Sequence, residues 1–120
     1  MRVSGEQRGR RLRLTPPTES AIQKLILAWL RLHGAWAVRV NSGAVRVGKR
    51  LVRFTDTVGT PDILCCVGGR LVGIEVKRPG GRLRPAQGEV LDAIRKAGGL
   101  AFVARSVDDV EQALRAEGLL

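Results

Sequence analysis

The stretch ILCCVGGRLVGIEVK, residues 63–77, decides the fold, because two apolar runs flank a Gly-Gly pair. Runs of this kind around two glycines are typical of a β-hairpin, with Gly68 and Gly69 as its loop residues. Counting outward from that turn places Asp62 opposite Glu75, and directly opposed residues share one face of a hairpin. The hairpin therefore predicts two neighbouring carboxylates at its open end.

Side-chain alternation assigns the two faces of this hairpin. Lys77 lies two residues beyond Glu75 and so joins the face of the two carboxylates. The other face is apolar and supplies the core with Ile63, Cys65, Val72, Ile74 and Val76.

Two close carboxylates repel each other unless a positive charge lies between them. Lys77 can supply that charge, and a divalent cation would do so better, since Mg²⁺ prefers carboxylate and carbonyl oxygens. Such a cation lowers the pKa of a bound water and stabilises the charge that develops on a phosphate. The alternative is a surface salt bridge between Glu75 and Lys77, with Asp62 in an ordinary Pro-Asp turn.

The flanking sequence predicts helices and short strands. A helix should begin after Thr18 and end before Gly34, with an apolar stripe of Ile22, Leu25, Ile26, Trp29 and Leu32. A strand is expected over 35–41, and a hairpin over 44–54 with one solvated basic face.

A helix from Pro85, a strand over 100–104 and a helix after Ser106 complete the chain. The helix from Pro85 is a crossover, which makes the strands before and after it parallel. We predict an α/β fold with a restriction-endonuclease-like core, a mixed β-sheet flanked by helices. Its order is α-β-β-β-α-β plus a C-terminal helix.

Positive charge is abundant and clustered. The 120 residues contain 21 Lys and Arg against 11 Asp and Glu, a net charge of +10, which favours a polyanionic partner. Residues 1–17 form a predicted flexible basic arm and residues 18–120 a single domain. Segments 39–53 and 78–84 contain no acidic residue, although a merely solvated strand face explains 39–53 equally well. The candidate DNA-binding residues are Arg39, Asn41, Ser42, Arg46, Lys49, Arg50, Arg53, Arg78, Arg82 and Arg84.

Cysteine usage and hydropathy indicate a reduced, cytoplasmic protein. Cys65 and Cys66 are neighbours in a predicted strand, so their side chains point to opposite faces and cannot pair. The longest apolar stretch, residues 21–32, is too short to span a bilayer and contains Lys24 and Arg31. We expect no membrane partner.

The segment Pro61-Asp62 followed by Glu75-Val76-Lys77 resembles the P-D…(D/E)-x-K signature of the restriction-endonuclease-like nuclease superfamily. The surrounding sequence is similar, more specifically, to the VRR-NUC family, the virus-type replication and repair nuclease domain. This likeness covers about residues 18–114 in the family's order. It rests on Thr18-Glu19, Asn41-Ser42-Gly43, Gly59-Thr60-Pro61-Asp62, Glu75-Val76-Lys77-Arg78-Pro79, Gly80-Gly81-Arg82-Leu83 and Gln87.

The resemblance implies roles for individual residues. Asp62 and Glu75 would bind Mg²⁺, or Mn²⁺ as a substitute, with the backbone carbonyl of Val76, and Lys77 would be the catalytic lysine. Glu19 would complete the acidic cluster directly or through water, and Gln87 corresponds to a family glutamine near the site. Some relatives in the wider superfamily carry an aromatic residue one turn later, where this chain has Leu91.

Duplex or branched DNA is the expected substrate. Aromatic residues make up only 3% of the chain, so single strands would find few side chains on which to stack. No helix-turn-helix or zinc module is recognisable for reading bases. Short members of the family resemble phage or bacterial proteins that dimerise and cut branched DNA such as Holliday junctions.

We therefore expect a homodimeric, Mg²⁺-dependent, structure-selective DNA endonuclease of DNA repair, in a bacterial or phage-infected host cell. The alternatives are a catalytically idle basic DNA-binding module and a restriction-type endonuclease with a fixed recognition sequence. An RNA substrate has no positive support in the sequence.

Overall fold

The computed structural model describes residues 15–40, 44–53 and 55–120. The predictions for the arm over residues 1–14 and for Asn41 and Ser42 lie outside the described residues. The elements follow the predicted order, and the hairpin predicted over 44–54 is present as a separate two-stranded sheet between the first and second strands of the main sheet. They are α2 (Glu19–Leu32), β1 (Trp36–Arg39), β2 (Ala44–Val47), β3 (Arg50–Arg53), β4 (Ile63–Val67), β5 (Arg70–Val76), α3 (Pro85–Lys96), β6 (Leu100–Ala104) and α4 (Val107–Ala116).

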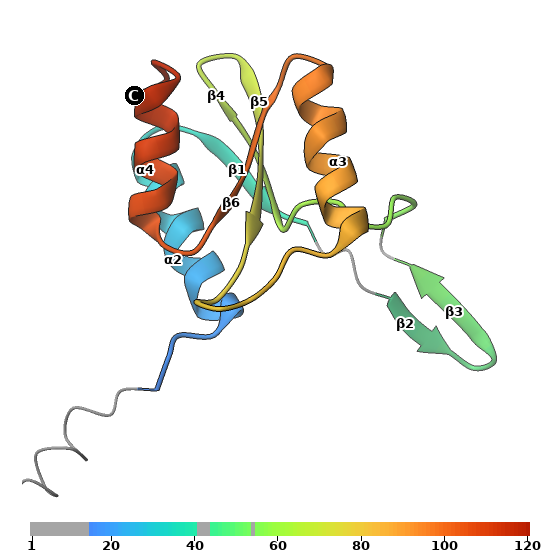
Figure 1. Cartoon of the computed structure of the whole chain (residues 1–120). Helices are drawn as coiled ribbons and strands as arrows, with labels where there is room; N and C mark the ends of the chain where they lie inside the picture. Colours follow the sequence, from blue (N-terminus) through green and yellow to red (C-terminus); the bar gives the residue numbers. More distant parts are fainter. Residues whose placement is uncertain (1–14, 41–43, 54) are drawn as a thin grey trace, which may run out of the picture.

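The main sheet has the strand order β1-β4-β5-β6. Strands β1, β4 and β5 pair antiparallel, and β5 pairs with β6 in parallel, as the crossover through α3 predicts. Helices α2 and α4 cover one face of this sheet and α3 covers the other (Figure 1). The predicted mixed α/β fold is confirmed. Among the described residues, no helix is long and apolar enough to cross a membrane.

The register of the central hairpin is the one that the Gly-Gly turn predicts. Val67 pairs with Arg70 and Ile63 pairs with Ile74, so the next position outward sets Asp62 beside Glu75. The predicted core face of this hairpin is fully buried. Burial raises the pKa of the Cys65 thiol to about 12, while its neighbour Cys66 is exposed on the opposite face.

The predicted apolar stripe of α2 is partly wrong. Thr18 does cap the helix, since its Oγ1 accepts a hydrogen bond from the backbone of Ala21 at 3.0 Å. Leu25 and Leu32, however, are 61% and 84% exposed. Because α2 packs on both β1 and α4, its inward face is rotated about its axis relative to the predicted stripe. That face consists of Ile22, Gln23, Ile26, Leu27 and Leu30.

The hairpin formed by β2 and β3, here called the ribbon, projects from the body of the protein (Figure 1). The predicted single basic face is wrong. The register pairs Arg46 with Leu51 and Val47 with Arg50, and opposed residues share a face. Arg46 and Arg53 therefore lie on one face, while Arg50 lies on the other among valines. All eight paired residues are exposed, so the ribbon is basic on both sides.

Gly59, in the loop before β4, and Gly73, on β5, allow α3 to pack closely against both of these segments. A Cβ on Gly73 would come within 2.8 Å of Cδ1 of Ile94 on α3. Gly59 has a φ of +90°, and a Cβ there would overlap the backbone carbonyl of Ala86 in the first turn of α3. The close approach at Gly59 sets the start of α3 beside the loop that leads to Asp62, and the one at Gly73 packs the last turn of α3 against β5.

Candidate active site

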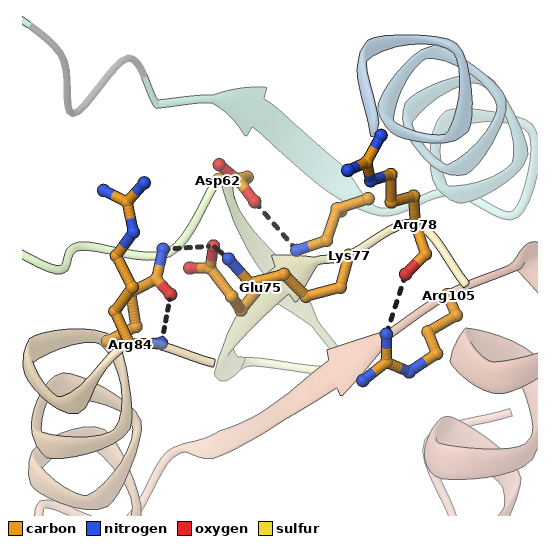
Figure 2. A network of polar contacts seen from close by, with 8 residues as sticks. Asp62, Glu75, Lys77, Arg78, Arg84 and Arg105 are labelled. Atoms are coloured by element: carbon orange, nitrogen blue, oxygen red, sulfur yellow. Dashed lines mark hydrogen bonds and ion pairs between the residues drawn. The ribbon is translucent and has the colours of Figure 1, made fainter. Parts of the chain in front are cut away.

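Asp62 is held by backbone groups of two strands. Its Oδ2 accepts a hydrogen bond from the backbone N–H of Val76 at 2.8 Å (Figure 2). The backbone carbonyl of Asp62 accepts a second one from the backbone N–H of Val40 at 2.7 Å. The preceding residue, Pro61, is buried. The half-buried Asp62 carboxylate is thereby fixed at the end of the hairpin where β5 finishes.

Glu75 is a buried carboxyl group with one unpartnered oxygen. The residue is only 2% exposed. Its Oε1 accepts a hydrogen bond from the side-chain amide of Gln87 at 3.0 Å, whereas Oε2 is buried and has no hydrogen-bond partner among the described residues. A buried polar oxygen of this kind is costly, and native structures usually satisfy such groups. The Oε2 atom is thus available to a ligand.

Lys77 completes the group on the same face. It is 6% exposed, and its Nζ lies 3.8 Å from Oε1 of Glu75, an ion pair too long for a hydrogen bond (Figure 2). The predicted juxtaposition of Asp62, Glu75 and Lys77 is therefore present in the fold. Lys77 contributes one positive charge to a pocket that contains two carboxyl groups.

The pKa of Glu75 is raised to about 8. Burial is the largest cause, and the charge of the neighbouring Asp62 adds to it. Glu19 raises the pKa further, while Lys77 lowers it. The metal-free site therefore favours the protonated form of Glu75 more than water does, and a bound cation would displace that proton.

Gln87 connects this cluster to α3. Its side-chain oxygen accepts a hydrogen bond from the backbone N–H of Arg84 at 2.8 Å, while its amide donates to Glu75. The predicted location of Gln87 near the site is confirmed. Leu91, one turn later on α3, is buried.

Glu19 lies near the cluster, as the first residue of α2. With Thr18 and Arg78 it lines a hollow of about 340 Å³, and its charge contributes to the raised pKa of Glu75. Within the described part of the chain, no three Asp, Glu, His or Cys side chains come close enough to hold a metal ion together.

The described DNA-binding candidates are all exposed. They lie at the end of β1, on the ribbon and in the segment between β5 and α3. Arg53 and Arg84 line a hollow of about 220 Å³ together with Gly59 and Gln87, which brings the base of the ribbon beside the acidic cluster. Basic side chains therefore border the cluster from the ribbon and from the start of α3.

Arg105 is a residue near the site that the sequence prediction missed. It follows β6, and its guanidinium Nη1 donates to the backbone carbonyl of Arg78 at 2.8 Å (Figure 2). Its position at the carboxyl end of a strand parallel to β5 was the available signal, because such ends meet at one edge of a sheet.

Comparisons with known proteins agree with this fold. The family model described as the VRR-NUC domain matches residues 17–108. A solved structure named "VRR_NUC domain protein" is similar with a TM-score of 0.55 and 22% sequence identity, covering 84% of this chain and 88% of that chain. At this identity the likeness shows the fold. No curated protein sequence matches the chain significantly.

Proposed function

The chain belongs to the VRR-NUC family of nucleases, and from this premise we propose that it is a metal-dependent, structure-selective DNA endonuclease. Its substrate would be branched DNA resembling a Holliday junction. The observation that carries the proposal is the juxtaposition of Asp62 with Glu75, whose buried Oε2 has no partner within the described ranges, beside the ammonium of Lys77.

The donor set suits Mg²⁺, with Mn²⁺ as a substitute. Asp62, Glu75 and the backbone carbonyl of Val76 would hold the ion, and Glu19 would contribute through water. Mg²⁺ is commonly bound by one or two carboxylates and by substrate phosphates, so two protein carboxylates are sufficient. When bound, the ion would supply a nucleophile at neutral pH and a positive charge against the phosphate.

The protein's own groups would prepare the site for phosphodiester hydrolysis. Lys77 lies beside Glu75, where it would orient the attacking water as an ammonium or deprotonate that water as a neutral amine. Gln87 holds Glu75 in one rotamer through its amide. Because Lys77 and Glu75 are nearly fully buried, their charges act in a medium where electrostatic interactions are stronger than in water.

Charge supports DNA as the substrate. The net charge of +10 and the exposed arginines around the cluster suit a phosphate backbone, and such binding is independent of base sequence. The ribbon projects from the body and presents basic side chains on both faces. The ribbon would bind a second DNA helix at a branch point. Its shape therefore favours a branched substrate over a linear one.

A homodimer is part of the same proposal. Resolution of a four-way junction requires two cuts, and each copy of this chain has a single P-D…E-x-K cluster. Two copies related by a two-fold axis would present two such clusters to opposed strands. We place this activity in DNA repair, in the cytoplasm of a bacterial or phage-infected host cell.

A panel of DNA substrates with matched sequence tests the proposal. Four-way junctions, flaps, forks and linear duplexes are incubated with the protein and Mg²⁺, Mn²⁺ or EDTA. We expect metal-dependent cleavage that favours the branched substrates. Binding without cleavage would instead support an idle DNA-binding module, and discrete fragments from a plasmid would support a restriction-type endonuclease.

A further inference from the structure

Arg105 emerges at the same sheet edge as the candidate catalytic residues. The parallel pairing of β5 with β6 aligns Val76 with Ala104, and the backbone N–H of Lys77 donates to the carbonyl of Ala104 at 3.1 Å. The chain then leaves the sheet through Arg78 on one strand and Arg105 on the other. The two arginines are therefore neighbours at the exit from the site.

Local contacts fix the backbone of Arg105 and leave its side chain at the surface. The backbone N–H of Arg105 donates to Oδ2 of Asp109 at 2.8 Å, and Ser106 caps α4 by accepting from Asp109 at 3.2 Å. The guanidinium donates one hydrogen bond from Nη1 to the carbonyl of Arg78. A guanidinium has five N–H donors, so most of this exposed group remains available.

Three of the other arginines outside the basic segments are bound to carboxylates, whereas Arg31 donates to the backbone carbonyl of Ala37. Arg70 pairs with Glu117 at 2.9 Å, Arg95 with Asp92 at 2.8 Å and Arg115 with Glu111 at 3.0 Å. Within the described ranges, Arg105 forms no salt bridge; Asp109 accepts from its backbone, and Asp108 only lines the same hollow. No carboxylate of the described residues therefore neutralises the charge of Arg105.

The positions of the arginines around the acidic cluster suggest how a DNA strand passes. Figure 2 shows Asp62, Glu75 and Lys77 between Arg84 on one side and Arg78 with Arg105 on the other. The Arg78 carbonyl points to Arg105, whereas its guanidinium points away from it, toward the hollow shared with Thr18 and Glu19. Both guanidinium groups are exposed on this side.

We propose that Arg105 and Arg78 form a phosphate-binding pair that holds the cleaved DNA strand on one side of the scissile phosphate, while Arg84 holds it on the other. Arg105 has two functions in this pair: it fixes the Arg78 carbonyl and it binds a phosphate with its remaining donors. Guanidinium groups suit this task, because they bind phosphate oxygens with two parallel hydrogen bonds. The inference rests on the proposed nuclease function.

Shortened substrates test this pair. Once the cut in the preferred junction is mapped, the cleaved strand is truncated close to the cut on its 5′ or its 3′ side, and kcat/KM is measured for the wild type, Arg105→Ala and Arg84→Ala. We expect Arg105→Ala to lower kcat/KM about tenfold on the full substrate, or ~1.4 kcal/mol. This loss should disappear for one truncation and persist for the other, and Arg84→Ala should show the opposite pattern.

Matched variants separate phosphate binding from a structural role. Arg115→Ala removes the same charge from an exposed position on α4 and should leave kcat/KM unchanged. Arg105→Gln keeps a donor for the Arg78 carbonyl but loses the charge, so its kcat/KM should match that of Arg105→Ala. If Arg105→Ala does not fold, Arg105→Gln is measured in its place. When DNA binding is measured in EDTA, Arg105→Ala and Arg105→Gln should each lower the slope of log K against log salt concentration by about 0.9.

If Arg105→Ala lowers kcat/KM equally on the full junction and on both truncated junctions, or lowers it on none of them, the proposed phosphate-binding pair is refuted. If the wild type binds DNA without cutting it, the proposed function fails, and the salt slope still decides the inference: an unchanged slope refutes it. If the wild type neither binds nor cuts DNA, both fail.

Discussion

The side-chain amide of Gln87 donates a hydrogen bond to Oε1 of Glu75 at 3.0 Å, and the oxygen of the same side chain accepts one from the backbone of Arg84 at 2.8 Å. Through these two bonds the first turn of α3 determines where a buried carboxyl group points. The candidate site thus depends on a helix that lies across the sheet from α2 and α4.

Replacement of Gln87 by Ala should therefore affect both stability and catalysis. The buried Oε1 loses its donor, which should lower the free energy of unfolding by about 1–3 kcal/mol and reduce the cleavage rate. Urea unfolding and single-turnover cleavage measure the two effects. Gln112→Ala, at an exposed position on α4, is the control and should change neither. Equal behaviour of the two variants would contradict the positioning role of Gln87.

The raised pKa of Glu75 predicts a pH-dependent stability of the metal-free protein. The folded state binds a proton with a pKa of about 8, against 4.5 for the free side chain, so between these values the folded state holds more protons than the unfolded state. This stabilisation is complete below about pH 4.5 and is lost as the pH rises through about 8, at up to ~1.4 kcal/mol per pH unit.

Glu75→Gln isolates this contribution, because the neutral amide does not titrate. In EDTA, the difference in the free energy of unfolding should shift in favour of the variant as the pH rises, and should become constant above about pH 8. Urea unfolding across this range measures it. A difference that stays constant from pH 5 to 8 would show that Glu75 is already ionised in the folded, metal-free protein.

Gly59 should resist substitution more than other glycines with a positive φ. A Cβ at Gly59 would overlap the carbonyl of Ala86, whereas Gly34 has a φ of +81° and no heavy atom within 4 Å of the added Cβ. Gly34→Ala should therefore cost about 1 kcal/mol of stability for its backbone conformation alone. Gly59→Ala should cost more and also slow cleavage, because the overlap displaces the first turn of α3. Thermal unfolding of Gly34→Ala and Gly59→Ala measures the two losses of stability. Equal losses would contradict the close contact between Gly59 and Ala86.

The ribbon should contribute to DNA affinity through phosphate contacts. Replacing Arg46 and Lys49 with Ser should lower the slope of log K against log salt concentration by up to about 1.8, since each phosphate contact contributes about 0.9. Lys96→Ser with Arg115→Ser removes the same charge from exposed positions on α3 and α4 and should leave the slope nearly unchanged. If both pairs lower the slope equally, binding depends only on net charge.

The central hairpin was predictable because its turn determines its register. Two glycines at the tip leave one way to pair the strands, and every opposed pair follows, including Asp62 with Glu75. The same counting was available for the ribbon around Gly48 and Lys49. There the prediction separated residues by type instead of by pairing, so it missed that Arg50 lies on the face opposite Arg46.

Other features depend on tertiary packing that local patterns do not contain. Leucines occur on several sides of α2, so periodicity alone did not show that the buried face includes Leu27 and Leu30 and leaves Leu25 exposed. Arg105 is far in sequence from Arg78, and only the parallel pairing of β5 with β6 brings the two together. The proximity of Gln87 to Glu75 was predicted by resemblance, while the hydrogen bond between them required the structure.

The central claim is that Asp62 and Glu75 together support metal-dependent DNA cleavage. Its most direct test is single-turnover cleavage of a four-way junction in Mg²⁺ by the wild type and by Asp62→Asn. The variant keeps an oxygen that can accept the Val76 hydrogen bond but loses the charge. We predict that Asp62→Asn cleaves at least about 10³-fold more slowly than the wild type, because a bound metal ion contributes several kcal/mol to transition-state stabilisation. The thermal unfolding temperature of the variant should be unchanged. Cleavage by Asp62→Asn at the wild-type rate, or wild-type cleavage that persists in EDTA, would contradict the claim.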